Sequence, residues 1–456
     1  MGHPGISGPA RFSGEIGDES LVLICVKGAI ICLTIKFLED NMTDTAPITW
    51  IENQRARTIE HSQAVNDLIP AGIARVTRAF HSRIPGYQTS PLKSLPRLAA
   101  FLGLGGIWVK DESFRLSLSS FKVLGGSFAI YSFVKSELGM NELDFFSPEG
   151  MALVREKLGD LTFAAATDGN HGRGVAWSAT RLGFKSVIYV HHKTSQARIQ
   201  AIESNGARVV VIKGTYDDAV RQVNEDAQKN GWQVISDTSW PGYEDVPRWV
   251  MQGYTTMFAE TQEQLAAQGI IKPSHILVQA GVGSLAAATL GFYAQLFGAG
   301  RPRTIVVEPD EAACLFKSAE IGDGEPYSFS GDLDTIMAGL ACGDPNPQAW
   351  RVLWDTADAF VKCPDYVAAK GMRVYGVPLA GDPFVVSGES GAATLGALMF
   401  IMQRPECAPL RDSLGLGRDS EVLLINSEGN TDPTYFRRVV WSGRHPVPDA
   451  YTTLGD

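Results

Sequence analysis

Apolar strand-like runs alternate with helix-like segments along most of this sequence, and this alternation limits the folds open to it. The strand-like runs are 161–167, 186–192, 208–214, 232–236, 275–281, 303–309 and 421–427. Between them lie segments whose apolar residues recur with helical spacing, such as 215–231. Strands that are apolar throughout are typical of parallel sheets covered by helices on both faces. The sequence therefore predicts an α/β, doubly wound fold.

Composition and charge favour a small-molecule partner. The chain has 456 residues, 45% of them apolar, which is enough for two packed domains or for a large domain with a smaller inserted one. Its net charge of −10 argues against a general affinity for nucleic acid or an anionic membrane. The six cysteines form no CxxC pair and no metal-ligand spacing, so we expect a reducing, cytoplasmic compartment and no metal site.

The first forty or so residues are a separate problem. The run 21–35 is the most hydrophobic of the chain, but it is short for a membrane span and carries Lys27 near its middle. The stretch before it has few of the basic residues that a signal peptide uses. We expect residues 1–42 to be a disordered extension or to precede the true start at Met42. A targeting or anchoring segment is the alternative.

A lysine stands in the otherwise apolar, glycine-rich stretch "SSFKVLGGSF" (119–128). Ser119 or Ser120 is a fair N-cap, which puts Lys122 in the first turn of a helix. The positive end of the helix dipole and the apolar neighbours both lower the pKa of an amine there, and this favours the nucleophilic form used in Schiff-base chemistry. The alternative is a surface lysine whose ammonium group reaches water.

Two glycine-rich loops follow strand-like runs. In "ATDGNHGRGVAW" (166–177), Asp168 and Asn170 stand at the carboxyl edge of a strand, among glycines that let the backbone approach a planar ligand. In "VQAGVGSLAAATLGF" (278–292), glycines leave the N–H groups of a helix start open to an anion. The second loop has neither GxGxxG nor GK[ST], so a single phosphate suits it better than a dinucleotide or ATP.

Two further polar residues end strand-like runs. Asp237 follows the run 232–236 near aromatic residues that can raise the pKa of a carboxyl group toward that of an acid/base catalyst; a turn or cap role is equally supported. Ser427 can meet a ring nitrogen or cap a turn. A lysine, a loop for one phosphate, an asparagine turn and a strand-end hydroxyl are together the parts that hold pyridoxal phosphate.

Longer motifs make this indication of a pyridoxal-phosphate site more specific. In order along residues 83–447 they are "FKVLGG", "TDGNHGRGVAW", "DTSWPGYEDVPRWVMQGY", "VEPDEAACLFKS", "TIMAGLACGDPNP", "SGESGAA" and "SEGNTDP". In these motifs the sequence resembles the fold-type II pyridoxal-phosphate enzymes and, among them, the diaminopropionate ammonia-lyases. The resemblance implies two doubly wound, open, twisted sheets with the cofactor between a large domain (43–130 plus 231–456) and a small inserted domain (131–230).

The resemblance also implies roles for single residues. Lys122 matches the Schiff-base lysine, and Asn170 matches the contact to the cofactor's ring hydroxyl. Asp168 and Asp237 match two acid/base residues, the first acting on the D-form of the substrate and the second on the L-form. The phosphate loop matches Gly281, Val282, Gly283, Ser284 and Leu285.

Other matched positions leave alternatives open. Ser427 is placed opposite the pyridine nitrogen, with Thr431 as the alternative. Glu389 either steadies the cofactor or substrate or caps the following helix. Cys314 and Cys342 can approach one another near the site entrance, although two free thiols are expected in a reducing compartment.

The implied reaction is the α,β-elimination of 2,3-diaminopropionate, in its D and L forms, to pyruvate and ammonia. Ammonia is a poor leaving group unless it is protonated, so a nearby acid must supply a proton. The runner-up is a threonine/serine dehydratase of the same fold, and the two aspartates favour the ammonia-lyase over it. A catalytically silent cofactor-fold protein is expected to lack the lysine, which is present. We expect a homodimer that binds a small amino acid, but no nucleic acid and no membrane.

Overall fold

The computed structural model describes the backbone of residues 15–16, 19–26 and 29–35 and residues 47–141, 143–167, 169–214 and 216–452. The chain divides into two compact units, Met1–Ala46 and Pro47–Asp456. In the first unit, three strands pair antiparallel in the order β1-β2-β3. These strands are β1 (Glu15–Ile16), β2 (Glu19–Val26) and β3 (Ala29–Ile35). The role predicted for residues 1–42 stays a prediction.

The larger sheet of the second unit has seven strands in the order β4-β13-β12-β11-β14-β6-β5. The strands are β4 (Thr49–Glu52), β5 (Leu92–Ser94), β6 (Gly106–Asp111), β11 (His275–Gln279), β12 (Arg303–Pro309), β13 (Ala359–Cys363) and β14 (Glu421–Asn426). The central strands are parallel, as predicted, whereas β4 and β5 pair antiparallel at the two edges. These two edge strands are short and lack a fully apolar run, and neither they nor β6 and β13 are among the strand-like runs predicted from the sequence.

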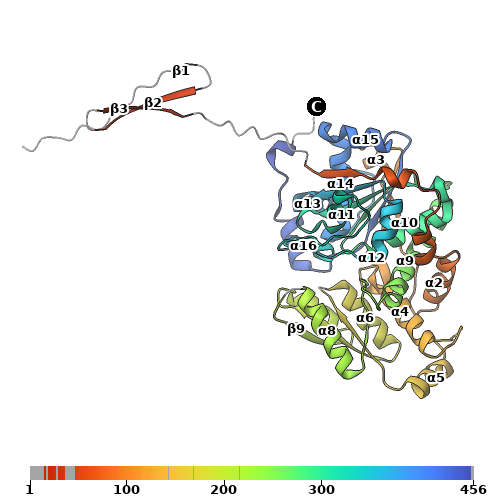
Figure 1. Cartoon of the computed structure of the whole chain (residues 1–456). Coiled ribbons are helices and arrows are strands. Elements are labelled where there is room, and N and C mark those ends of the chain that lie inside the picture. The colour runs from red at the N-terminus through yellow and green to blue at the C-terminus, as the bar shows by residue number, and fades with distance from the viewer. Residues whose placement is uncertain are drawn as a thin grey trace, which may run out of the picture. The chain divides into compact units, whose positions relative to one another are not determined.

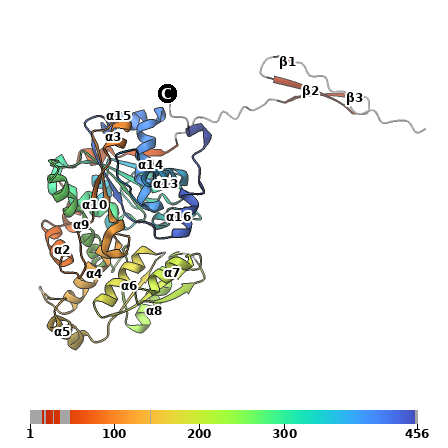
Figure 2. The same cartoon turned by 180° about the vertical axis from the view of Figure 1, so that it is seen from behind.

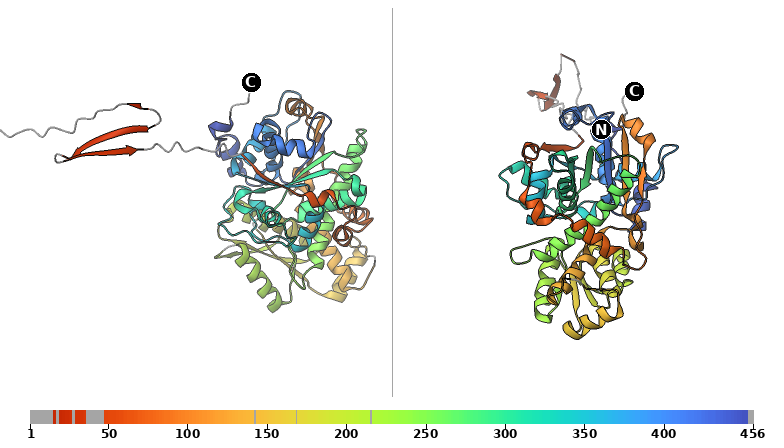
Figure 3. Two further views of the ribbon diagram at one scale, coloured as in Figure 1. Left: turned by 45° about the horizontal axis from the view of Figure 1, so that its top comes forward. Right: turned by 90° about the vertical axis from the view of Figure 1, so that its right-hand side faces the viewer.

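The smaller sheet has four parallel strands in the order β10-β7-β8-β9. They are β7 (Thr162–Ala166), β8 (Lys185–His191), β9 (Arg208–Ile212) and β10 (Gln233–Val234). All four match predicted strand-like runs. In Figures 1 and 2 its strands and helices lie together at one end of the second unit, and both views of Figure 3 show the same grouping.

Helices cover the sheets. They are α1 (Gln63–Leu68), α2 (Ile73–His81), α3 (Pro96–Leu102), α4 (Lys122–Glu137), α5 (Pro148–Leu158), α6 (Asn170–Arg181), α7 (Gln196–Glu203), α8 (Tyr216–Asn230), α9 (Asp245–Ala266), α10 (Ser284–Phe297), α11 (Cys314–Ile321), α12 (Pro347–Thr356), α13 (Asp365–Gly376), α14 (Glu389–Gln403), α15 (Ala408–Leu414) and α16 (Pro433–Val440). None of the helices in the described residues is long and apolar enough to cross a membrane.

Strand β11 shows why the sheets must be covered on both faces. Ile276 and Val278 point into the core that contains α9 and α10, whereas Leu277 between them points into a second core formed with α13 and α14. All three side chains are fully buried. Because neighbouring strand residues point to opposite faces, an apolar run of this kind requires helices on both sides, and the predicted doubly wound α/β fold is confirmed.

Two elements of the structure lie at the predicted boundaries between the large and the small domain. Helix α4 (Lys122–Glu137) runs across the predicted boundary between residues 130 and 131. Strand β10 lies just beyond residue 230 and pairs with β7 of the smaller sheet. The domain boundaries stay a prediction, and both sheets belong to one compact unit.

Candidate active site

Lys122 is the first residue of α4, as the sequence predicts, but neither serine is the cap. Phe121 occupies the cap position, and Ser120 Oγ accepts only a long contact, 3.5 Å, from the Lys122 backbone N–H. The Lys122 ammonium donates instead to Asp237 Oδ2 at 2.5 Å and lies 5.4 Å from the centre of the Phe121 ring. The Lys122 side chain is 19% exposed and that of Asp237 is 9% exposed, so the ion pair is largely shielded from water.

The ion pair reverses both pKa shifts that the sequence suggests. Burial alone lowers the pKa of Lys122, but the facing Asp237 carboxylate more than offsets it, and the pKa rises above the usual range. Burial alone raises the pKa of Asp237, but the charges of Lys122 and His171 hold it well below the usual range. The predictions of a lowered lysine pKa and a raised aspartate pKa are wrong for this arrangement, because the sequence does not reveal that the two groups face each other.

The predicted phosphate loop links β11 to the start of α10. Gly283 adopts a left-handed conformation, φ 99°, and no side chain caps the helix after it. A Cβ at Gly281 would lie 3.1 Å from Cys342 Sγ and 3.2 Å from Leu340 Cα, so the loop runs close to its neighbours, which would have to shift to admit a side chain there. Since the first N–H groups of a helix have no intrahelical partner, this uncapped helix start fits a phosphate group.

Asn346, which is not predicted from the sequence, ties the phosphate loop to Asp237. Its Nδ2 donates to the Asp237 carbonyl at 3.0 Å and to Ser284 Oγ at 3.2 Å. Ser284 Oγ donates to the same carbonyl at 2.5 Å, and Asn346 Oδ1 accepts from Ser239 Oγ at 2.7 Å. Asn346 also caps α12, and the Asn-Pro pair that starts this helix is the signal that could have singled it out.

The asparagine turn and the end of β14 meet beside Lys122. Asn170 begins α6, and its Nδ2 donates to Glu428 Oε2 at 2.5 Å. Ser427 accepts a hydrogen bond from the Phe121 backbone N–H at its carbonyl, 3.2 Å, and from Gln279 Nε2 at its hydroxyl, 2.7 Å. Glu428 and Gln279 are not predicted from the sequence, because the partners that give them a role lie 258 and 148 positions away along the chain.

The structure describes the remaining predicted site residues to different degrees. Asp168 lies outside the described residues, so its role stays a prediction. Thr431 Oγ1 donates to Glu428 Oε2 at 3.4 Å, which leaves both Ser427 and Thr431 as alternatives for the ring nitrogen. Glu389 is the first residue of α14, 5% exposed, and burial followed by the charge of Glu428 raises its pKa to about 7. Cys314 is a buried thiol that donates to the Gly281 carbonyl at 3.7 Å.

Tyr254 on α9 completes the surroundings of the ion pair. Its side chain is fully buried, and its hydroxyl has no hydrogen-bond partner among the described residues. Its ring packs edge-on against Phe121 with 4.7 Å between the ring centres. Burial raises the pKa of Tyr254, while the charge of Lys122 acts in the opposite direction. A neutral phenol therefore lies beside the charged pair.

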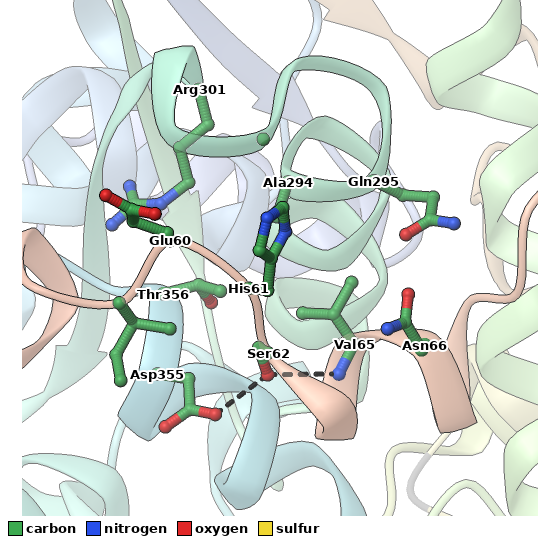
Figure 4. A pocket seen from close by; sticks show the side chains of 12 residues that line it. Glu60, His61, Ser62, Val65, Asn66, Ala294, Gln295, Arg301, Asp355 and Thr356 are labelled. Carbon is green, nitrogen blue, oxygen red and sulfur yellow. Dashed lines mark hydrogen bonds between the residues drawn. The ribbon is translucent and has the colours of Figure 1, made fainter.

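A surface pocket elsewhere in the second unit contains none of these residues. It is lined by residues 59–62, 65–66, 294–295, 298, 301 and 355–356. Figure 4 shows that the Ser62 hydroxyl, among the residues that line it, accepts from the Val65 N–H and donates to Asp355. These contacts cap α1 and hold it against α12.

Comparisons with known proteins show the family to which the chain belongs. Residues 84–425 match the family described as "Pyridoxal-phosphate dependent enzyme". The diaminopropionate ammonia-lyase of Escherichia coli (strain K12) is 44% identical over 377 residues, which cover 82% of this chain and 92% of that protein. The structure of the Escherichia coli enzyme in complex with D-serine has a TM-score of 0.80 at 41% identity and covers 88% of this chain and 98% of that chain.

Two further relatives bear on the chemistry. The structure of the Escherichia coli diaminopropionate ammonia lyase with an aminoacrylate-PLP azomethine reaction intermediate has a TM-score of 0.78 at 41% identity, covering 88% of this chain and 98% of that one. The L-threonine dehydratase of Corynebacterium glutamicum is more distant, 27% identical over 255 residues that cover 55% of this chain and 50% of that protein. The chain belongs to the pyridoxal-phosphate dependent enzymes and, within them, to the diaminopropionate ammonia-lyases.

Proposed function

We propose that this protein is a pyridoxal-phosphate dependent ammonia-lyase that converts 2,3-diaminopropionate to pyruvate and ammonia. The observation that carries the proposal is the contact of Lys122 Nζ with Asp237 Oδ2 at 2.5 Å, between the phosphate loop and the asparagine turn. The bound cofactor supplies an electron sink for the negative charge left when the substrate loses its α-proton.

The chain's own groups then move the protons. We assign the α-proton of the L-form to Asp237, as the resemblance to the ammonia-lyases implies, and its Oδ2 is a carboxylate oxygen next to the reactive amine. Lys122 Nζ, which holds a proton in the ion pair, donates it to the departing β-amine, since ammonia leaves easily only when it is protonated. The proton that Asp237 has taken then passes to Lys122 Nζ across their contact, which restores both groups. For the D-form we assign the α-proton to Asp168.

The remaining residues hold the cofactor. The N–H groups at the start of α10, from Gly281 to Leu285, bind its phosphate. Asn170 would hold its ring hydroxyl, and Ser427 would hold its ring nitrogen. Asn346 Nδ2 donates to the Asp237 carbonyl at 3.0 Å and to Ser284 Oγ at 3.2 Å. These hydrogen bonds hold the base at a fixed distance from the phosphate loop.

We also propose a homodimer in a cytoplasmic, reducing compartment. Phe114, Val377 and Phe384 are 59%, 75% and 68% exposed. Lys93 joins two of them, because its Nζ donates to the Phe384 carbonyl at 2.8 Å and lies 5.0 Å from the centre of the Phe114 ring. Exposed apolar side chains of this size are typical of surfaces that a second copy covers, and they support the dimer. The buried thiols of Cys314, Cys363 and Cys407 support the reducing compartment.

The test compares substrates. The purified holoenzyme is incubated separately with D-diaminopropionate, L-diaminopropionate, L-threonine and L-serine, and the oxo acids released are measured. We expect the highest kcat/KM with diaminopropionate. Turnover of threonine or serine without release of pyruvate from either diaminopropionate enantiomer would replace this proposal with the dehydratase.

A further inference from the structure

Glu428 is a buried carboxylate that accepts hydrogen bonds at both oxygens. Its residue is 3% exposed. Oε2 accepts from Asn170 Nδ2 at 2.5 Å, and Oε1 accepts from the Ser390 backbone N–H at 3.2 Å. Thr431 Oγ1 adds a longer contact of 3.4 Å to Oε2. Each of these hydrogen bonds, which join described residues, brings a donor to the carboxylate.

The backbone around Glu428 holds that carboxylate in place. The Gly388 N–H donates to the Glu428 carbonyl at 3.0 Å, and Glu428 forms an isolated antiparallel bridge with Ser120, two residues before Lys122. A Cβ at Gly388 would lie 2.9 Å from Glu428 Oε1, so the start of α14 packs directly against the carboxylate. Glu428 therefore has little freedom to turn away from Asn170.

The contact also joins the two sheets. Asn170 follows β7 of the smaller sheet, whereas Glu428 follows β14 of the larger one. An ionised carboxylate only accepts hydrogen bonds, so the Asn170 group that faces it has to be the amide nitrogen. That nitrogen carries a second hydrogen, which stays available as a donor. If the amide were turned over, its oxygen would face the carboxylate at close range and the donor would be lost.

We propose that Glu428 is a positioning residue that sets the orientation of the Asn170 amide, so that Asn170 donates to the cofactor's ring hydroxyl. This inference rests on the proposed cofactor role of Asn170. Glutamine cannot replace Glu428, because glutamine offers one acceptor and one donor where the site supplies donors on both sides. In Glu428→Gln, one of the two contacts becomes donor against donor, and turning the Asn170 amide over relieves it.

The first experiment compares Glu428→Gln with Glu421→Gln. Glu421 starts the same strand, and its Oε2 accepts from Trp108 Nε1 at 2.7 Å, so the control removes one acceptor from β14 without touching Asn170. The readouts are the release of pyridoxal phosphate from the diluted holoenzyme, the absorption maximum of the bound cofactor and the Tm. We expect Glu428→Gln to weaken cofactor retention about tenfold and to shift the maximum, since a hydrogen bond to a charged group is lost. We expect Glu421→Gln to match the wild type in both cofactor readouts.

A second pair of variants separates positioning from simple stabilisation. Asn170→Asp sets two carboxylates against each other and is expected to lower the Tm. In the double variant Glu428→Gln/Asn170→Asp, the amide introduced at position 428 can donate to the new carboxylate while its oxygen still accepts from Ser390, so the link between the sheets returns. The new carboxylate has no N–H to offer the cofactor. We therefore expect the double variant to regain Tm but not cofactor retention.

Two results would overturn the inference. One is a Glu428→Gln holoenzyme with wild-type retention and absorption maximum. The other is a double variant that regains retention together with Tm, because Glu428 would then act only as a structural link. Neither readout requires substrate, so this inference can fail while the wild type still releases pyruvate from diaminopropionate, and the reverse also holds.

Discussion

At the scale of single residues, the site is organised around a lysine and an aspartate that keep each other charged. The Lys122 ammonium and the Asp237 carboxylate are 2.5 Å apart in a largely dry environment, which strengthens their attraction. The raised pKa of Lys122 and the lowered pKa of Asp237 follow from this one contact. A pair of this kind holds a proton on the amine and keeps the carboxylate ionised.

Replacing Asp237 by asparagine tests the carboxylate. Asp237→Asn keeps the size of the side chain but removes the base proposed for the L-form. We expect kcat with L-diaminopropionate to fall by about 10²- to 10⁴-fold, the usual contribution of a general base. The D-form, assigned to Asp168, is expected to lose much less. Equal losses for the two enantiomers would contradict the separate roles of the two aspartates.

Glu389 predicts a pH dependence of stability. Its pKa is raised from 4.5 to about 7 by burial and by the charge of Glu428, so the folded state binds a proton more tightly than the unfolded state does. A raised carboxyl pKa makes the free energy of unfolding decrease as the pH rises from about 4.5 to about 7. Glu389→Gln removes this decrease, and the variant is expected to gain about 3 kcal/mol relative to the wild type between pH 4.5 and pH 8. Denaturant titrations that give parallel pH curves for the two proteins would contradict the shift.

At the scale of elements, three helices approach unusually closely around the lysine. A Cβ at Gly125 of α4 would lie 2.5 Å from the Tyr254 ring of α9, and one at Gly253 of α9 would lie 2.5 Å from the Leu124 carbonyl. On the other side of α4, Gly126 packs against Gly174 and Val175 of α6. The space that these glycines leave beside Lys122 is filled by neighbouring helices, and this close packing sets the position of the first turn of α4.

Adding a methyl group tests this packing. Gly125→Ala improves helix propensity but pushes the new Cβ into Tyr254, so we expect a net loss of about 1 to 3 kcal/mol in the free energy of unfolding. Gly417→Ala is the matched control, because nothing lies within 4 Å of a Cβ there. Chemical denaturation measures both variants. Equal stability of Gly125→Ala and the control would show that α4 and α9 have room to separate.

At the scale of the whole second unit, a buried charge network holds together the elements that carry the site. Glu260 of α9 accepts from Lys110 of β6 at 2.7 Å and from Arg115 at 2.9 and 2.7 Å, and Arg115 also donates to Glu112. All four side chains are fully buried. If one partner is removed, a buried charge remains without an opposite charge beside it. The network is therefore stable only when all four side chains are present.

Glu260→Gln is expected to lower the free energy of unfolding by about 3 to 5 kcal/mol, the usual cost of breaking a buried ion pair. Glu263→Gln, on the same helix, removes a side chain that is 66% exposed and lies 3.4 Å from Arg78. That control is expected to cost less than about 1 kcal/mol. Thermal unfolding distinguishes the two variants, and similar Tm values for both would contradict a structural role of the network.

The sequence predicts the architecture better than the contacts within the site. Buried parallel strands such as β11 could be predicted because a fully apolar run is stable only when both faces of its sheet are covered. Lys122 could be singled out because it is a charged residue among apolar ones. The Lys122–Asp237 pair was not predictable, because it joins segments 115 positions apart along the chain. Glu428 and Asn346 were missed for the same reason: their function lies in partners that only the folded chain brings to them.

The measurement that tests the central claim most directly is pyruvate release from both enantiomers of diaminopropionate by the wild-type holoenzyme and by Lys122→Ala, each supplied with excess pyridoxal phosphate. The account predicts pyruvate and ammonia from the wild type. It predicts no turnover by the variant, which also lacks the visible absorption band of cofactor held on the lysine. Undiminished pyruvate release by Lys122→Ala, or none by a wild type that carries the cofactor, would contradict it.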